Sequence, residues 1–177
     1  MSAEPVAPGP APLIVSALFG PEDFAWLDGL RRAHFPPARN LLPAHLTLFH
    51  HLPPSVEREM VRRLAAIARD EPRPGATADA VMNLGRGTAI RIAAPALAAM
   101  RAGLAEAFAG LLVPQDAGGW RAHVTIQNKV TPAQACDLQA QLGPAFRPRP
   151  VRIAGLAAWR YRGGPWEPVS RHLFRTG

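Results

Sequence analysis

The sequence has little of what secreted and membrane proteins usually need. Cys136 is its only cysteine, so no internal disulfide can form, and no Cys/His spacing typical of a zinc site is present. No apolar segment is long enough to span a bilayer, and the Pro/Ala-rich start, residues 1–11, lacks the basic and apolar regions of a signal peptide. We therefore expect a cytoplasmic protein with no membrane contact.

Lysine is equally scarce. Lys129 is the only one, yet the 177-residue chain has a net charge of +7, so arginine supplies nearly all of the positive charge. Arginine presents a planar set of donors that matches phosphate, and the charge therefore favours an anionic partner such as nucleic acid. The high Ala and Pro content leaves open the alternative that the chain simply uses arginine in place of lysine throughout.

A duplicated motif is the most informative feature present. His45-Leu46-Thr47-Leu48 and His123-Val124-Thr125-Ile126 share the same pattern, and each follows an alanine and precedes a Pro-containing segment. The second histidine follows the first by 78 residues. A single H-x-T is uninformative, whereas two copies in matching surroundings indicate a duplicated half that carries one histidine and one threonine.

Alternation along a strand gives each copy two faces. Side chains at every second position of a strand point the same way. The histidine and threonine of each copy therefore share one face, and the apolar residues between them point into a core. The alternative for either copy alone is an ordinary half-exposed strand, but the matched pair indicates a cleft with two imidazoles and two hydroxyls.

The same offset relates the elements that we expect on either side of the motifs. Each half reads as strand, helix, H-x-T strand, helix, strand, and the second helix of the second half opens with a capping box, Thr131-Pro132-Ala133-Gln134. The expected ranges besides the motif strands are 13–19, 21–34, 54–69 and 77–84, then 88–93, 96–111, 132–142 and 154–162, with a final strand at 166–174. We predict a disordered tail at 1–12 and one bilobal domain at 13–177, with halves of about 13–85 and 86–177.

Two histidines facing each other suit phosphodiester chemistry. One group must take a proton from the attacking oxygen, another must give one to the leaving oxygen, and imidazole does either near neutral pH. The threonine hydroxyls can donate to the non-bridging phosphate oxygens. This arrangement requires neither a metal nor a cofactor, so we expect none.

The paired motif resembles that of the two-histidine (2H) phosphoesterase superfamily, which includes the bacterial 2'-5' RNA ligase-like proteins and RNA 2',3'-cyclic phosphodiesterases. The resemblance implies an α+β fold, a bilobal pseudo-twofold duplication in which two antiparallel sheets form a central cleft with helices on the outside. It implies metal-independent hydrolysis of 2',3'-cyclic phosphate ends of RNA or nucleotides, with His45 and His123 as the acid/base pair and Thr47 and Thr125 binding phosphate.

The chain departs from this family at one position. Many relatives carry an arginine two positions past the last apolar residue of the second motif, where this chain has Asn128 followed by Lys129. Lys129 is therefore a candidate substrate contact, but which cation contacts the phosphate is left open.

Other candidates follow from position. Arg121 shares the face of His123 if the strand begins there, and Phe49 shares the face of His45 and could stack on a base; a solvated rim charge and packing at the strand end are the alternatives. In the strand 154–162, either Trp159 and Tyr161 or Arg160 and Arg162 should face the cleft, which makes Tyr161 a further candidate. We interpret His50 and His51 as loop histidines, His34 and His172 as structural or exposed residues, and Cys136 as a small core residue.

Three functions remain open at this point. The first is a monomeric cyclic phosphodiesterase whose partner is RNA or a nucleotide with a 2',3'-cyclic phosphate. The second is a 2'-5' RNA ligase or RNA-binding module whose hydrolysis is incidental, because the reverse reaction uses the same groups. The third is an α+β interaction domain in which both H-x-T pairs are structural.

Overall fold

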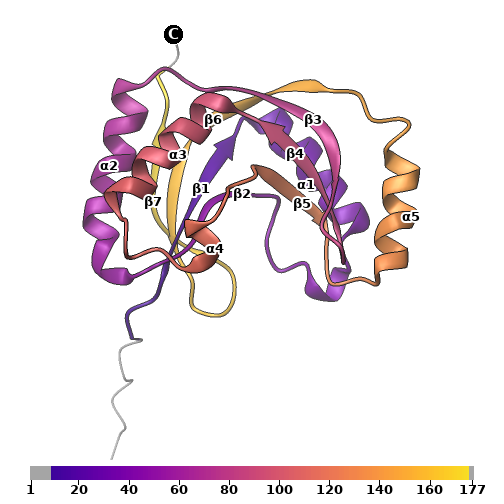
Figure 1. Ribbon diagram of the computed structural model, residues 1–177, viewed down its shortest axis with the longest axis horizontal. Coiled ribbons are helices and arrows are strands. Elements are labelled where there is room, and N and C mark those ends of the chain that lie inside the picture. Colours follow the sequence, from indigo (N-terminus) through magenta and orange to yellow (C-terminus); the bar gives the residue numbers. More distant parts are fainter. Residues whose placement is uncertain (1–8, 176–177) are drawn as a thin grey trace, which may run out of the picture.

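The computed structural model describes residues 9–175, and its elements follow the expected order (Figure 1). The first half contains β1 (Leu13–Phe19), α1 (Pro21–His34), β2 (Leu46–Leu52), α2 (Glu57–Asp70) and β3 (Gly75–Asn83), with 3-10 turns η1 (Pro37–Arg39) and η2 (Pro54–Val56). The second half contains β4 (Thr88–Ala93), α3 (Pro95–Ala107), α4 (Pro114–Ala117), β5 (His123–Gln127), α5 (Pro132–Leu142), β6 (Arg149–Arg160) and β7 (Glu167–Leu173). Of the expected tail at 1–12, residues 1–8 lie outside the described part of the chain.

Local sequence signals explain most of these boundaries. The capping box at Thr131 is present, and its side chain accepts from the backbone N–H of Gln134 while Gln134 accepts from the backbone N–H of Thr131. Helix α3 is shorter than expected, because the chain leaves the helix at Phe108 and Gly110 then adopts a φ of 83°, a left-handed conformation that glycine accommodates without steric cost. Strand β6 begins at Arg149, well before the expected position 154.

All strand pairs are antiparallel, and the order is β2-β1-β6-β3-β4-β5, with β7 also pairing with β6. Helices lie on the outside of this sheet (Figure 1). The expected α+β fold is therefore confirmed. The two expected sheets are joined rather than separate, because β6 pairs with β3 at its start and with β1 and β7 over the rest of its length.

The third strand of each half completes the sheet of the other half. Strand β3 of the first half pairs with β4 of the second, and β6 of the second pairs with β1 of the first. The two exchanged strands also pair with each other, from Gly75 opposite Arg152 to Ala78 opposite Arg149. Because neither half contains all the strands of its own sheet, we propose that residues 13–177 fold as one unit.

The core forms between the sheet and its covering helices. Leu46, Leu48, Val124 and Ile126 are fully buried, as their alternation with the motif residues predicts. Burying such a side chain contributes about 1.5–3 kcal/mol. The first helix, α1, packs against β5 of the other half, while α2 packs behind β6 and β7 and α5 behind β3 and β4. The apolar residues of each motif therefore anchor its histidine to a packed strand.

Candidate active site

The two motif strands lie side by side, although they occupy opposite ends of the strand order (Figure 1). The curved sheet therefore brings its first and last strands together. A cavity of about 300 Å³ opens between them, and His45, Thr47, His123 and Thr125 all line it. The structure thus brings the four side chains of the duplicated motif into one cleft.

Both histidines are held by the same local hydrogen bond. His45 Nδ1 lies 2.8 Å from the carbonyl oxygen of Pro43, and His123 Nδ1 lies 2.7 Å from the carbonyl oxygen of Arg121. A carbonyl oxygen only accepts, so Nδ1 carries the hydrogen in each ring. The neutral tautomer therefore leaves a lone pair on Nε2, the nitrogen available to a ligand in the cleft.

The surroundings of His45 favour its neutral form. Burial lowers the pKa of His45 to about 4; the hydrogen bond to Pro43 opposes this shift, and the positive charges of Arg31, His50 and His123 add to it. The Trp166 ring covers the imidazole, with 4.6 Å between ring centroids. His45 is therefore neutral at pH 7 and able to accept a proton.

Two buried arginines connect each motif strand to the opposite half. Arg31 of α1 donates through Nη1 to the carbonyl oxygen of Thr125 at 2.8 Å, and Arg101 of α3 donates through Nε to that of Leu48 at 3.1 Å. Trp120 Nε1 adds a third bond, to the carbonyl oxygen of Thr47 at 3.0 Å. Hydrogen bonds from charged donors to buried carbonyls are among the stronger ones in proteins. They hold the two motifs in fixed relative positions.

Interpreting His50 and His51 as loop histidines was wrong, because both lie within β2. His50 lines the same cleft, with Nδ1 2.9 Å from Oδ1 of the buried Asp116. No local pattern in the sequence could reveal this contact, because Asp116 follows His50 by 66 residues and only the tertiary fold brings them together. Other cleft-lining residues that the sequence did not single out are Gln115, Gly119, Trp120 and Trp166.

Phe49 is not a substrate contact, because it is fully buried and lies under the guanidinium of Arg101. Its placement results from irregular pairing between β1 and β2. Thr47 lies opposite Ser16 but Phe49 opposite Val15, so β2 contains an extra residue there. An extra residue in one strand reverses the alternation beyond it, which turns Phe49 into the core and allows His50 to face the cleft.

The remaining candidates divide between cleft and surface. Arg121 is exposed and lines the cleft, whereas Lys129 and Tyr161 are exposed and do not line it. Trp159, rather than Tyr161, faces the site region, where its Nε1 donates to Ser16 Oγ at 2.8 Å. Cys136 is exposed on α5, so its interpretation as a core residue was wrong.

A second cavity, of about 450 Å³, adjoins the cleft and shares His45 and Trp166 with it. Its wall is mostly apolar and includes Trp159, Phe24 and Leu41, with Ser16 and Arg171 as polar residues besides His45. Phe24 and Leu41 are 38% and 66% exposed. Large apolar side chains gathered at an open cavity are typical of a ligand site. The cleft therefore has an apolar chamber on its His45 side.

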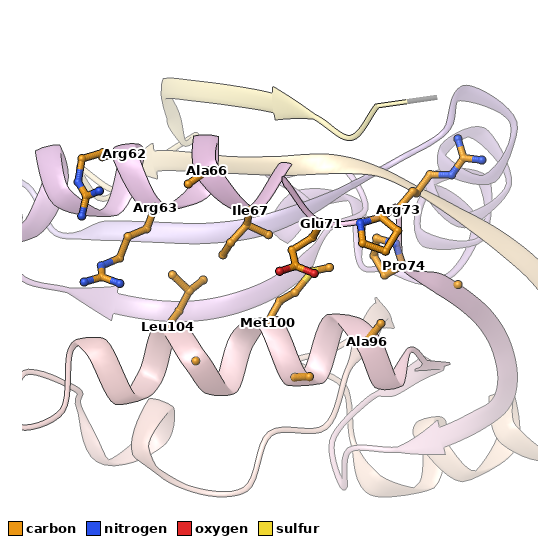
Figure 2. Close-up of a pocket in the computed structure, with 14 residues that line it drawn as sticks. Arg62, Arg63, Ala66, Ile67, Glu71, Arg73, Pro74, Ala96, Met100 and Leu104 are labelled. Carbon is orange, nitrogen blue, oxygen red and sulfur yellow. The ribbon is translucent and has the colours of Figure 1, made fainter. Parts of the chain in front are cut away.

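A further hollow, of about 620 Å³, lies away from the histidines between α2 and α3 (Figure 2). Ile67 faces Met100 and Leu104 across it. The nearby Arg62 and Arg63 both pair with Glu59. It shares no residue with the cleft, so the chemistry of the motif residues does not extend to it.

Comparison with known proteins fits this geometry. The sequence profile described as the 2'-5' RNA ligase superfamily matches residues 19–165. The chain belongs to this superfamily. No curated protein matches the chain significantly.

Solved structures of low sequence identity share the superfamily fold. Escherichia coli LigT in complex with 3'-AMP superimposes with a TM-score of 0.60 at 17% identity, covering 95% of this chain and 100% of its own. TT0787 of Thermus thermophilus gives 0.59 at 16% identity, covering 93% and 98%. A structure described as a phosphoesterase gives 0.56 at 19% identity, covering 94% and 100%.

Within residues 9–175, no group of three or more His, Cys, Asp or Glu side chains is placed to hold a metal ion. None of the helices within the same range is both long and apolar enough to cross a membrane.

Proposed function

We propose that this superfamily member is a metal-independent phosphodiesterase that hydrolyses 2',3'-cyclic phosphate ends of RNA or nucleotides. The observation that carries the proposal is the matched pair of imidazoles, each with Nδ1 bound to a backbone carbonyl and Nε2 left to one shared cleft. We expect it to act as a monomer in the cytoplasm.

The low pKa of His45 supports a role for this residue as the base. His45, neutral at pH 7, accepts a proton from the attacking water through Nε2. The water oxygen bonds to phosphorus, the bond from phosphorus to the 2' or 3' oxygen breaks, and protonated His123 gives its Nε2 proton to that oxygen. Thr47 and Thr125 donate to the non-bridging oxygens, where charge increases in the transition state. The product is a phosphate monoester, and solvent returns each imidazole to its starting state.

The apolar chamber beside His45 supports a nucleotide substrate. A group that occupies it must be attached close to the phosphate, because His45 and Trp166 line both cavities. Trp159 and Trp166 lie 6.1 Å apart between centroids, and such aromatic walls bind bases by stacking. E. coli LigT has been crystallised with 3'-AMP and with NADP+, both of which contain adenine.

Ligation is the second candidate, and the superfamily to which the chain belongs favours it. A 5'-hydroxyl in the place of water would lose its proton to His45 and bond to phosphorus, the bond from phosphorus to the 3' oxygen would break, and His123 would protonate that oxygen, which leaves a 2'-5' phosphodiester. Hydrolysis and ligation therefore differ only in the attacking oxygen.

One panel of substrates tests both activities. Purified protein is incubated with 2',3'-cyclic mononucleotides, with an oligonucleotide ending in a cyclic phosphate, and with that oligonucleotide plus a second one carrying a 5'-hydroxyl. Chromatography then separates 2'-phosphates, 3'-phosphates and joined strands. Hydrolysis that persists in EDTA is expected. The proposal fails if no cyclic phosphate is opened, or if EDTA abolishes turnover and a divalent ion restores it.

A further inference from the structure

A third imidazole in the cleft has no role in the two-histidine reaction. We propose that His50 binds the substrate phosphate through Nε2, and that Asp116 is a positioning residue that fixes the His50 ring. This inference rests on the proposed function, because it assigns a further contact to the same phosphate site.

The Asp116 carboxylate accepts hydrogen bonds from His50 and His51. This carboxylate is 1% exposed and accepts from the backbone N–H groups of His50 and His51 and from His50 Nδ1, all at 2.9 Å. Burial alone would raise the pKa of Asp116, but the hydrogen bonds from His50 and His51 outweigh it and lower the pKa. Asp116 is therefore an ionised acceptor at neutral pH.

This acceptor fixes the orientation of the His50 ring. An ionised carboxylate cannot donate, so Nδ1 of His50 carries a hydrogen and Nε2 is the only other polar atom of the ring. The ring lines the cleft with His45 and His123. All three imidazoles therefore have Nδ1 bound to the protein, but His50 alone has an anionic partner. When protonated, His50 forms an ion pair with Asp116 and can still donate Nε2–H to a phosphate oxygen.

The site has few other sources of positive charge for a bound phosphate. The guanidinium groups of Arg31 and Arg101 donate to backbone carbonyl groups around the motif strands. Of the described residues that line the cleft, Arg121 is the only permanent cation, and it is exposed. A half-buried imidazole backed by a carboxylate supplies a donor from inside the cleft, where a hydrogen bond to phosphate is least weakened by water.

His51 provides a matched control for His50. The two histidines are adjacent, and the backbone N–H of each donates to Asp116, which an alanine at either position retains. Their side chains differ, since His50 lines the cleft and His51 is exposed without lining it. A loss of phosphate binding specific to position 50 therefore reports the His50 ring rather than the local backbone.

The test is a titration with inorganic phosphate, followed by NMR of the histidine ring nitrogens and by the dissociation constant. Phosphate should shift the Nε2 resonance of His50 and leave that of His51 unchanged. His50→Ala should raise the Kd for phosphate and the KM for a cyclic mononucleotide by about 5–30-fold with a smaller effect on kcat, because it removes one charge-assisted donor. His50→Gln keeps a donor and should recover part of the loss, and His51→Ala should stay within about twofold of wild type.

A double-mutant cycle tests Asp116. Asp116→Asn should weaken phosphate binding nearly as much as His50→Ala, and the double variant should be little worse than either, because the two residues act as one unit. A purely structural role would instead make the two effects additive. If Asp116→Asn does not fold, by circular dichroism, the His50 variants and ring shifts still decide the proposal.

The outcomes separate this inference from the proposed function. Phosphate binding that depends on His50 in a protein without cyclic phosphodiesterase activity would retain the inference and overturn the proposed reaction. Wild-type Kd for phosphate in His50→Ala, or equal losses in His50→Ala and His51→Ala, would overturn the inference whether or not cyclic phosphates are hydrolysed.

Discussion

Because the pKa of His45 is low, we predict that the acidic limb of the pH–rate profile, where the base becomes protonated, lies at a lower pH than for an ordinary histidine. With a pKa of about 4, His45 is still about 90% neutral at pH 5, whereas an unperturbed histidine with a pKa of 6.5 would be about 3% neutral. A drop from pH 7 to pH 5 should therefore reduce the fraction of competent base by about a tenth, rather than by about 25-fold.

The same shift makes folding stability depend on pH. The pKa of His45 is lower in the folded than in the unfolded chain, so its contribution is fully present above pH 6.5 and is lost as pH falls through about 4. A shift from 6.5 to about 4 corresponds to at most about 3.4 kcal/mol in the free energy of unfolding. Other groups titrate in this range, so the effect is measured as a difference from His45→Gln, which lacks the ionisation.

Two measurements check this reasoning. The first is kcat/KM for a cyclic mononucleotide between pH 4 and 8, where the acidic limb gives an apparent pKa of the coupled histidines. The second is urea unfolding of wild type and His45→Gln at pH 7.5 and 4.5, where the wild type should lose more stability. An acidic limb near 6.5, with equal pH dependence of unfolding in both proteins, would refute the assignment of His45 as a base that is still neutral at pH 5.

Three further predictions concern the cleft and its surroundings. His45→Ala and His123→Ala should each reduce kcat by about 10²–10⁴-fold and the double variant little more, measured on a cyclic mononucleotide; near-wild-type turnover of either folded single variant would contradict the two-histidine mechanism. Leu41→Ser should raise the KM for cyclic nucleotides by about 3–10-fold and leave the KM for a base-free ribose cyclic phosphate unchanged. Leu173→Ser, at an equally exposed leucine outside the chamber, should change neither KM. If Leu41→Ser and Leu173→Ser had equal effects, the chamber would not bind the base. Oligonucleotide Kd should rise with salt more steeply than mononucleotide Kd, and salt-independent binding would attribute the arginine content to composition alone.

Local pattern was sufficient to predict most of the elements and the four motif residues that the cleft brings together. The amphipathic alternation in His45–Leu48 and His123–Ile126 follows from the geometry of a strand, and both copies place their apolar residues in the core. Helix boundaries with strong local signals, such as Thr131-Pro132, were also predictable.

Features that depend on pairing between distant segments were not predictable. The extra residue that buries Phe49 exists only relative to Val15 on the neighbouring strand, and the contact of His50 with Asp116 joins the two halves. The exchange of β3 and β6 between the two halves of the sheet likewise depends on tertiary pairing. A sequence repeat indicates which elements correspond to each other, but it does not indicate which strands are neighbours in the sheet.

The exchanged strands also bear on how such a chain could arise. A single ancestral half, ending in the equivalent of β3, could complete its sheet only by accepting that strand from a second copy. It would therefore have been a strand-swapped homodimer, with one H-x-T strand from each subunit facing the other across a true twofold axis. Gene fusion would then free the two copies to diverge. One imidazole could acquire the covering Trp166, an apolar chamber and a depressed pKa, while its twin stayed beside the exposed Arg121. Two identical subunits would place the same residues on both sides of the cleft, so these differences between the two sides require a single fused chain.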